Sequence, residues 1–163
     1  MKVCSFTGHR IIPEAHKAAM PAMLERAVNF AYSEGCREFC VGGALGFDTE
    51  AAKAVIKFRM SHSDVILHVV VPCADQADSW GASHRAMYDY LIGCADRVSV
   101  LSDSYHGSCM KERNRRLAES CDIMIAYCNR YASGAGQTVK MAELAGKKVY
   151  NLYSALNSGI DRE

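Results

Sequence analysis

Two short segments rich in glycine have the composition of loops that bind phosphate groups. One covers residues 42–46 (Gly-Gly-Ala-Leu-Gly), the other covers residues 133–138 (Ser-Gly-Ala-Gly-Gln-Thr), and a predicted helix follows or overlaps each. Small residues let the backbone approach a ligand closely, and free amides at a helix N-terminus attract anions. The spacing G-G-x-x-G differs from the dinucleotide fingerprint G-x-G-x-x-G, and the chain has no P-loop. The alternative is that the glycines only permit tight turns and that Asp48 and Thr49 cap the following helix.

Arg113 and Asn114 are expected to point into the protein rather than to solvent. In the helix predicted over residues 110–121, they occupy the positions three and four residues after Met110, where the apolar stripe is interrupted. A buried guanidinium needs an anionic partner, and it can hold a phosphate with two donors. The partner is either a bound anion or the carboxylate of Asp48 or Asp103.

Further polar and aromatic residues follow other predicted strands. Arg10 is a second candidate for anion binding, unless its loop turns outward. His9 is a ligand contact, a proton donor or a simple cap. Trp80, which follows Gln76, packs partly in the core or stacks beside a base or ribose, and Tyr131 is either another stacking group or an ordinary surface residue.

Familiar motifs for nucleophilic or metal-dependent catalysis are missing from the sequence. It contains no G-x-S-x-G, no H-E-x-x-H and no C-x-x-C, and no histidine pair at ligand spacing accompanies Cys36 and Cys40. We therefore expect no metal and no permanent cofactor, and we expect most of the eight cysteines to pack in the core. A Cys109 nucleophile with His106 as its base stays open, because nearness in sequence does not establish geometry.

Short apolar runs alternate with longer segments of helical period along the chain. This alternation predicts an α/β fold in which a doubly wound, mainly parallel sheet lies between two helical layers, a three-layer sandwich. The predicted strands cover residues 2–6, 38–41, 65–71, 97–101, 123–127 and 148–152, and the predicted helices cover residues 13–33 with a break at Pro21, 47–60, 78–94, 110–121 and 137–145. The segments above would then meet at the carboxyl ends of the strands, where such sheets bind ligands.

Length and charge narrow the functional classes. A chain of 163 residues fits one domain over residues 1–163. Its 19 basic and 18 acidic residues give a formal net charge of +1, which lacks the positive field of a nucleic-acid-binding surface. Apolar runs are too short to span a membrane, and the amino end has no secretory signal. We expect a cytoplasmic protein that binds neither membrane nor nucleic acid, with a homo-oligomer left open.

Together these segments resemble the SLOG superfamily, and most closely its YpsA-like branch. The resemblance covers about residues 3–150 and is carried by residues 7–10 (Thr-Gly-His-Arg), 43–48 (Gly-Ala-Leu-Gly-Phe-Asp), Pro72 with Gln76 and Trp80, 109–115 (Cys-Met-Lys-Glu-Arg-Asn-Arg), and Gly134 with residues 137–139 (Gln-Thr-Val). It implies a Rossmann-like fold and a pocket for a nucleotide-derived ligand such as ADP-ribose, NAD or AMP. A sensor fits this picture, and an interaction role in cell division or stress control is a further alternative.

The same superfamily contains the LOG phosphoribohydrolases, which release a base from a nucleoside monophosphate. Their motifs are M-x-x-R-K and P-G-G-x-G-T-x-x-E. Residues 110–113 (Met-Lys-Glu-Arg) match the first through its arginine, with Asn114 in place of the lysine, whereas no glutamate stands at the acidic position of the second. Glu143 is nearby but out of register. If the chain is an N-glycosidase of this type, the resemblance implies Arg113 and Glu143 as catalytic candidates.

The sequence thus predicts one site for a small nucleotide derivative at the carboxyl edge of the sheet. Its loops come from separate parts of the chain and depend on the fold to meet. The residues predicted to bind the ligand are Thr7, Gly8, His9, Arg10, Gly42, Gly43, Ala44, Gly46, Asp48, Gln76, Trp80, Arg113, Asn114, Ser133, Gly134, Gly136 and Thr138.

Overall fold

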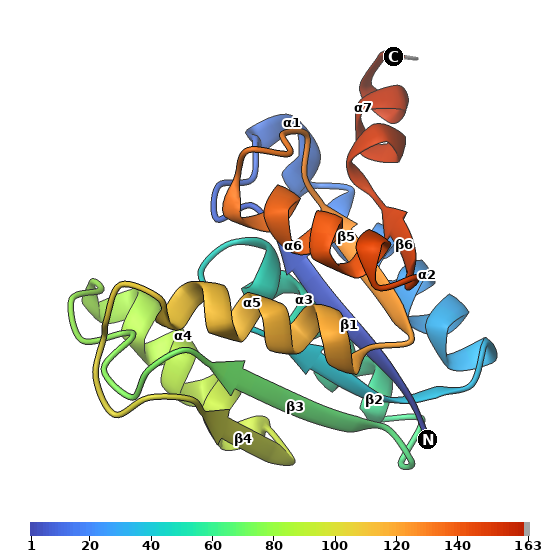
Figure 1. The fold of residues 1–163 in the computed structure, drawn as a ribbon. Helices are drawn as coiled ribbons and strands as arrows, with labels where there is room; N and C mark the ends of the chain where they lie inside the picture. The colour runs from blue at the N-terminus through green and yellow to red at the C-terminus, as the bar shows by residue number, and fades with distance from the viewer. Residues whose placement is uncertain (162–163) are drawn as a thin grey trace.

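A computed structural model describes residues 1–161, with side chains up to residue 157. Strands and helices alternate along it, as the apolar pattern predicts (Figure 1). The elements are β1 (Lys2–Gly8), α1 (Glu14–Lys17), α2 (Met20–Ser33), β2 (Cys36–Val41), α3 (Phe47–Arg59), β3 (Ile66–Val71), α4 (Ala82–Cys94), β4 (Arg97–Val100), α5 (Cys109–Ser120), β5 (Ile123–Tyr127), α6 (Gly134–Leu144), β6 (Lys148–Asn151) and α7 (Tyr153–Asp161).

The six strands form one sheet in the order β4-β3-β2-β1-β5-β6. Every pairing is parallel, and β1 pairs with β2 on one side and with β5 on the other. The chain therefore builds the sheet outward from β1 to β4, returns to the centre and continues with β5 and β6. This doubly wound, Rossmann-like order confirms the predicted fold class and places its reversal point between β1 and β5.

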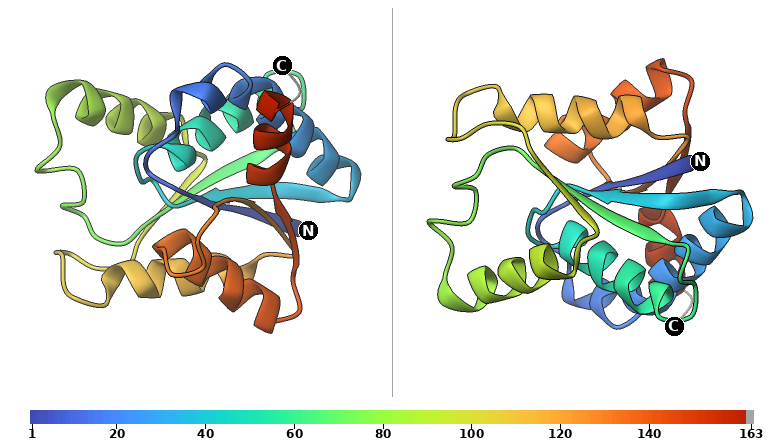
Figure 2. Two further views of the ribbon diagram at one scale, coloured as in Figure 1. Left: turned by 90° about the horizontal axis from the view of Figure 1, so that it is seen from above. Right: turned by 90° about the horizontal axis from the view of Figure 1, so that it is seen from below.

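Helices cover both faces of the sheet. Figure 2 shows α5 and α6 on one face, with α2, α3, α4 and the terminal helix α7 on the other. The larger core lies on the second side and contains Phe6, Phe39 and Phe47, each fully buried. A smaller core, which includes Met124 and Val139, lies under α5 and α6. Burial of each large apolar side chain contributes about 1.5–3 kcal/mol, so both layers are firmly attached to the sheet.

The ends of several elements differ from the prediction. β1 continues to Gly8, so Thr7 and Gly8 belong to the strand rather than to the loop after it. α4 begins at Ala82 instead of residue 78, because residues 73–80 form successive turns closed by bonds such as Trp80 N–H to Ala77 O. Trp80 therefore lies before the helix, although the predicted bounds of 78–94 placed it inside.

The break predicted at Pro21 holds, and one element was missed. Pro21 lies in the first turn of α2, where its lack of an N–H has no cost. Gly35 and Gly146 have positive φ angles of 107° and 78°, as expected of glycines that end helices. The helix α7 was not predicted from the sequence. None of the helices in the described part of the chain is long and apolar enough to cross a membrane.

All eight cysteines are free thiols. Only Cys94 is partly exposed, and the others are buried, which confirms that they pack mainly as small apolar residues. Burial raises the pKa of Cys73 to about 12 and has the same effect on most of the others, so these groups remain neutral at physiological pH. Cys109 is fully buried at the start of α5, whereas His106 is exposed.

Candidate functional site

A cavity of about 800 Å³ opens at the carboxyl ends of β1 and β5, where the strand order reverses. The loop after β1, the loop after β5 and the starts of α3, α5 and α6 line it. Of the predicted site residues, ten lie here: Thr7, Gly8, His9, Arg10, Ala44, Asp48, Arg113, Asn114, Ser133 and Gly134. The fold thus brings together segments that are separated by more than a hundred positions in the sequence.

Arg113 lines this cavity and is 5% exposed. α5 places it inward in its second turn, as the interrupted apolar stripe predicts. Its Nε donates a hydrogen bond of 2.8 Å to Asn114 Oδ1, and its Nη1 donates to the carbonyl oxygen of Gly42. These bonds use two of the five guanidinium N–H groups, and Arg113 still lines the cavity. The side chain is therefore held in place before any ligand binds.

Asp48, 5% exposed, is the carboxylate whose charge acts on this guanidinium. Burial raises the pKa of Asp48, and the charge of Arg113 and the amide of Ala44, 3.2 Å from Oδ2, oppose this rise. Burial likewise lowers the pKa of Arg113 while Asp48 raises it, so the two charges stabilise each other. Of the two carboxylates considered as partners of Arg113, Asp48 is therefore the one that acts on it, and it offsets the buried charge in part. The other, Asp103, is exposed.

Gly42 allows this arrangement because it has no side chain. A Cβ on Gly42 would lie 2.5 Å from Arg113 Nη1 and 2.8 Å from Asp48 Oδ2, closer than nonbonded atoms approach. The residue is buried and does not line the cavity, so its part in the site is to leave room for the guanidinium. The glycine requirement here is one of close approach rather than of a left-handed backbone.

The start of α6 forms another wall of the cavity. Ser133 is its N-cap, and the Oγ atom accepts a hydrogen bond of 3.0 Å from Gly136 N–H. A Cβ on Gly136 would lie 2.1 Å from the carbonyl oxygen of Arg130, so this glycine permits the turn. Thr138 Oγ1 donates to Gly134 O at 2.8 Å. Gly136 and Thr138 are therefore engaged within the helix, while Ser133 and Gly134 face the cavity.

His9, Asn129 and Tyr153 form a further part of the cavity lining. His9 Nε2 lies 2.9 Å from Asn129 Oδ1, and Asn129 Nδ2 donates to Tyr153 Oη at 3.2 Å. The rings of His9 and Tyr153 meet edge to face with centroids 6.2 Å apart. All three residues, together with Arg130, line the cavity. Asn129 and Arg130 belong to the loop after β5, which the predicted topology already places at this edge of the sheet. Tyr153 is on α7, which the sequence did not predict.

Four of the predicted residues lie outside this cavity and beside two neighbouring ones. Gly43, Gly46 and Trp80 line a second cavity of about 820 Å³ on the α2–α4 side, and Gln76 lines a smaller one with Trp80. Gln76 Nε2 donates to Gly43 O at 3.2 Å. Arg10 lines all three cavities, so it marks the boundary between them. The structure does not place Trp80 beside Arg113.

The catalytic candidate Glu143 lies away from this cavity. It is exposed in the last turn of α6, nine residues after Gly134, and a helix rises about 14 Å over that length. It is absent from the residues that line the cavity. Asp48 is the carboxylate at this site.

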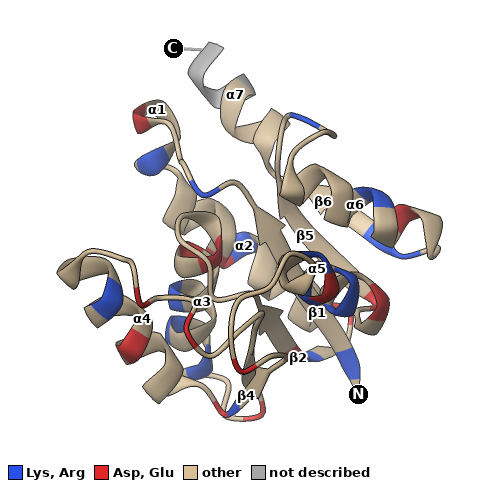
Figure 3. Cartoon of the chain, turned by 60° about the vertical axis from the view of Figure 1, so that its left-hand side comes forward, with Lys and Arg blue, Asp and Glu red and all other residues tan. Residues whose placement is uncertain are grey.

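Charges elsewhere on the chain are mixed. Figure 3 shows acidic and basic residues interspersed along α3, α4, α5 and α6 rather than gathered into one basic face. The formal net charge of the sequence is +1, and the helices seen in this view carry charges of both signs.

Comparison with known proteins agrees with this architecture. A UPF0398 protein of Bacillus cereus (strain G9842) is 24% identical over all of this chain and 97% of its own length, and UPF0398 protein BH1768 of Halalkalibacterium halodurans is 27% identical over 78% of this chain and 72% of its own. DNA processing protein A (DprA) of Streptococcus pneumoniae superposes with a TM-score of 0.66 at 20% identity, over 93% of this chain. DprA of Helicobacter pylori superposes with a TM-score of 0.62 at 16% identity.

This chain spans 50% of the pneumococcal DprA chain and 64% of the Helicobacter one, so the likeness concerns the shared fold. In sequence, the model of the YspA SLOG family (YpsA) matches residues 14–155. That match includes α5, the start of α6 and every strand except β1. The chain therefore belongs to the YspA SLOG family.

Proposed function

We propose that the protein binds a small nucleotide-derived anion, such as ADP-ribose, NAD or AMP, in the cavity between β1 and β5. The observation that carries this proposal is the buried guanidinium of Arg113 at the point where the strand order reverses. A guanidinium in this position has lost much of its hydration, and Asp48 only partly replaces it. A phosphate group would supply negative charge beside Arg113 and accept hydrogen bonds from the remaining N–H groups of its guanidinium.

The other walls suit the rest of such a ligand. Arg10 and Arg130 are exposed at the rim, where they can contact a second phosphate or attract the ligand. The first turn of α6 presents Ser133 and Gly134, with the amides of a helix N-terminus beside them. Tyr153 offers a ring surface for a base or ribose. The volume of about 800 Å³ lies within the range of small-molecule sites.

Thermal unfolding with ADP-ribose, NAD and AMP tests the proposal. A ligand at 100 times its Kd stabilises a protein by about 2.7 kcal/mol, which is roughly 5–11 °C for a chain of this size. Arg113→Ala should abolish this shift, and Arg115→Ala, an exposed position on the same helix, is the matched control. Calorimetric titration of the folded variant separates lost binding from lost stability. Equal affinity of Arg113→Ala and wild type would refute the assigned role.

A second candidate is hydrolysis of the N-glycosidic bond of a nucleoside monophosphate. It is favoured by one observation: Asp48, whose pKa burial raises, lines the same cavity as Arg113. A carboxyl group with a raised pKa can act as a general acid. Chromatography after incubation with a panel of nucleotides would detect the free base, and Asp48→Asn should stop its release. Absence of any free base across the panel removes this candidate and leaves binding alone.

Single-stranded DNA is the main competitor to a small ligand, because the H. pylori neighbour is described by its single-stranded DNA binding mode. The mixed surface charges of this chain favour the small ligand, since DNA affinity depends on many phosphate contacts. Fluorescence anisotropy with a labelled oligonucleotide distinguishes the two. Oligonucleotide binding that ADP-ribose, NAD and AMP all fail to displace, with none of them stabilising the protein, would favour DNA.

A further inference from the structure

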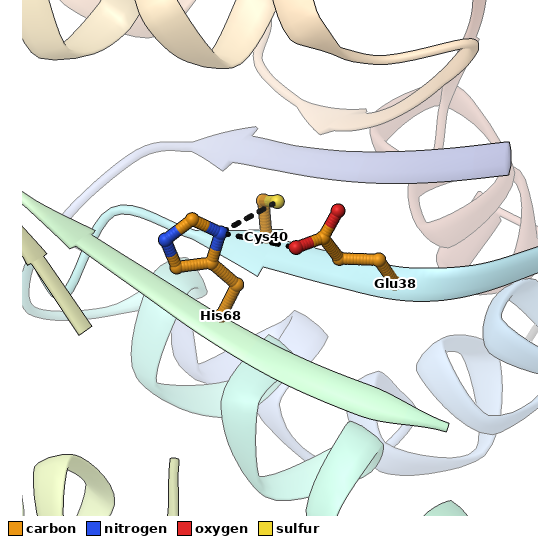
Figure 4. Close-up of side chains that lie close together, drawn as sticks. All are labelled: Glu38, Cys40 and His68. Atoms are coloured by element: carbon orange, nitrogen blue, oxygen red, sulfur yellow. Dashed lines mark hydrogen bonds and ion pairs between the residues drawn. The ribbon is translucent and has the colours of Figure 1, made fainter. Parts of the chain in front are cut away.

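Glu38, Cys40 and His68 form a compact cluster on the face of the sheet that α5 covers (Figure 4). Glu38 and Cys40 are two residues apart on β2, so their side chains point to the same face. His68 lies opposite Cys40 in the parallel pairing of β2 with β3. None of the three lines the ligand cavity described above. The cluster is therefore a separate feature of the molecule.

The three donor atoms lie close together. Nδ1 of His68 lies 3.2 Å from Glu38 Oε1 and 3.8 Å from Cys40 Sγ, and one ligand atom from each residue lies within 4.8 Å of the other two. In a tetrahedral zinc site, metal–ligand distances of about 2.0–2.3 Å give N···O and N···S separations of about 3.4 and 3.6 Å. The two contacts of His68 already match these separations to within a few tenths of an ångström.

We propose that Glu38, Cys40 and His68 bind one Zn²⁺ ion, with a water molecule as the fourth ligand. The donor set of one nitrogen, one thiolate sulfur and one carboxylate oxygen suits zinc better than magnesium or calcium, which prefer oxygen alone. A thiolate and a carboxylate neutralise the two charges of the ion. Such a neutral group tolerates partial burial, and the side chains of Glu38 and His68 are only 14% and 13% exposed.

Ser99, on the adjacent strand β4, orients the histidine. Its Oγ lies 2.7 Å from His68 Nε2, so the other ring nitrogen, Nδ1, faces Glu38 and Cys40. Metal-binding histidines usually bond a polar group through the nitrogen that does not bind the ion. Burial lowers the pKa of His68, and the neighbouring Glu38 carboxylate opposes this shift.

Two features of the cluster oppose metal binding and must be overcome. Burial raises the pKa of Cys40 to about 12, so zinc has to displace the thiol proton into solvent. Arg97 Nη1 also contacts Glu38 Oε1 at 3.1 Å, so zinc must compete with this ion pair, in which the Arg97 side chain is 58% exposed. The positive charge of Arg116 lowers the pKa of both Cys40 and His68.

Titration of the chelator-treated full chain with Co²⁺, a spectroscopic probe for zinc sites, tests the proposal. We expect one equivalent to bind and to give a near-ultraviolet band from charge transfer between thiolate and cobalt. Zn²⁺ should displace it and raise the unfolding temperature. If no such band forms with the wild-type chain, Glu38 and His68 form only a hydrogen-bonded pair, and the proposal is overturned.

Two nearly isosteric variants test the sulfur and nitrogen ligands. Cys40→Ser should lose the charge-transfer band, and His68→Gln should lose stoichiometric binding, with circular dichroism verifying that both are folded. Cys128→Ser, another buried cysteine, is the matched control and should keep the band. Ser99→Ala should weaken binding roughly 10- to 100-fold, as loss of a supporting hydrogen bond does at other metal sites. A band that persists in Cys40→Ser would assign the metal to another cysteine and refute the site.

Discussion

The substitution Gly42→Ala tests whether the site depends on the position of Arg113. The added methyl would lie 2.5 Å from Arg113 Nη1 and 2.8 Å from its Cζ, so the guanidinium must move away from the Gly42 carbonyl that it now contacts. Because the overlap involves the end of a long side chain, the fold should survive. Overpacking of this kind costs about 1–3 kcal/mol, which is roughly 2–12 °C in unfolding temperature.

Gly42→Ala should also weaken binding of the nucleotide. A hydrogen bond to a charged group contributes about 1.5–3 kcal/mol, so displacing the guanidinium should raise the Kd of the bound nucleotide roughly 10- to 150-fold. Calorimetric titration and urea unfolding measure the two effects separately. Gly93→Ala is the control, because nothing lies within 4 Å of its added Cβ. A Gly42→Ala variant that keeps the wild-type Kd would refute the reasoning that Arg113 must stay where it is.

Three further predictions concern stability. Gly46→Ala should cost more than Gly42→Ala, since Gly46 has a φ of 78° and the new Cβ would meet backbone at 2.1 Å; urea unfolding gives the comparison. Ser133→Ala should cost about 1 kcal/mol in the same assay, because it removes the cap that accepts from Gly136 N–H. Burial raises the pKa of Asp48, so the folded state binds its proton more tightly than the unfolded state, where the pKa is about 3.9. Stability that comes from protonated Asp48 is therefore present below about pH 4 and is lost as the pH rises through the raised pKa of the folded state, so Asp48→Asn should gain stability relative to wild type as the pH rises above about 4. A difference between the two urea midpoints that stays constant with pH would contradict this last prediction.

Predictions based on side-chain period were the most successful. The interrupted stripe after Met110 correctly placed Arg113 inside, because a helix brings positions three and four residues apart onto one face whatever the rest of the chain does. Short apolar runs likewise identified all six strands to within two residues. The central strands are largely buried, as expected in a parallel sheet covered on both faces, whereas the edge strands β4 and β6 are mostly exposed.

Predictions at the ends of elements were weaker. The start of α4 was placed four residues too early, because residues 73–80 bury Cys73 and Ala77 in turns that have no regular period. Tyr153 was missed for a similar reason: its approach to Asn129 depends on how α7 packs after β6. Glu143 was chosen from a motif in sequence, yet the length of α6 separates it from the cavity.

The sequence by itself determined the alternation of strands and helices, the parallel sheet and the edge at which the glycine-rich loops gather, because these follow from local periodicity and from the geometry of parallel crossovers. Only the tertiary structure decided which loops meet. The order β2-β1-β5 places residues 8–10 beside residues 129–134 and leaves Trp80 at a different cavity. The register of β2 against β3 likewise brings His68 to Cys40, although 27 residues separate them in the chain. Strand order and register depend on the packing of the whole sheet, and no local pattern in the sequence encodes them.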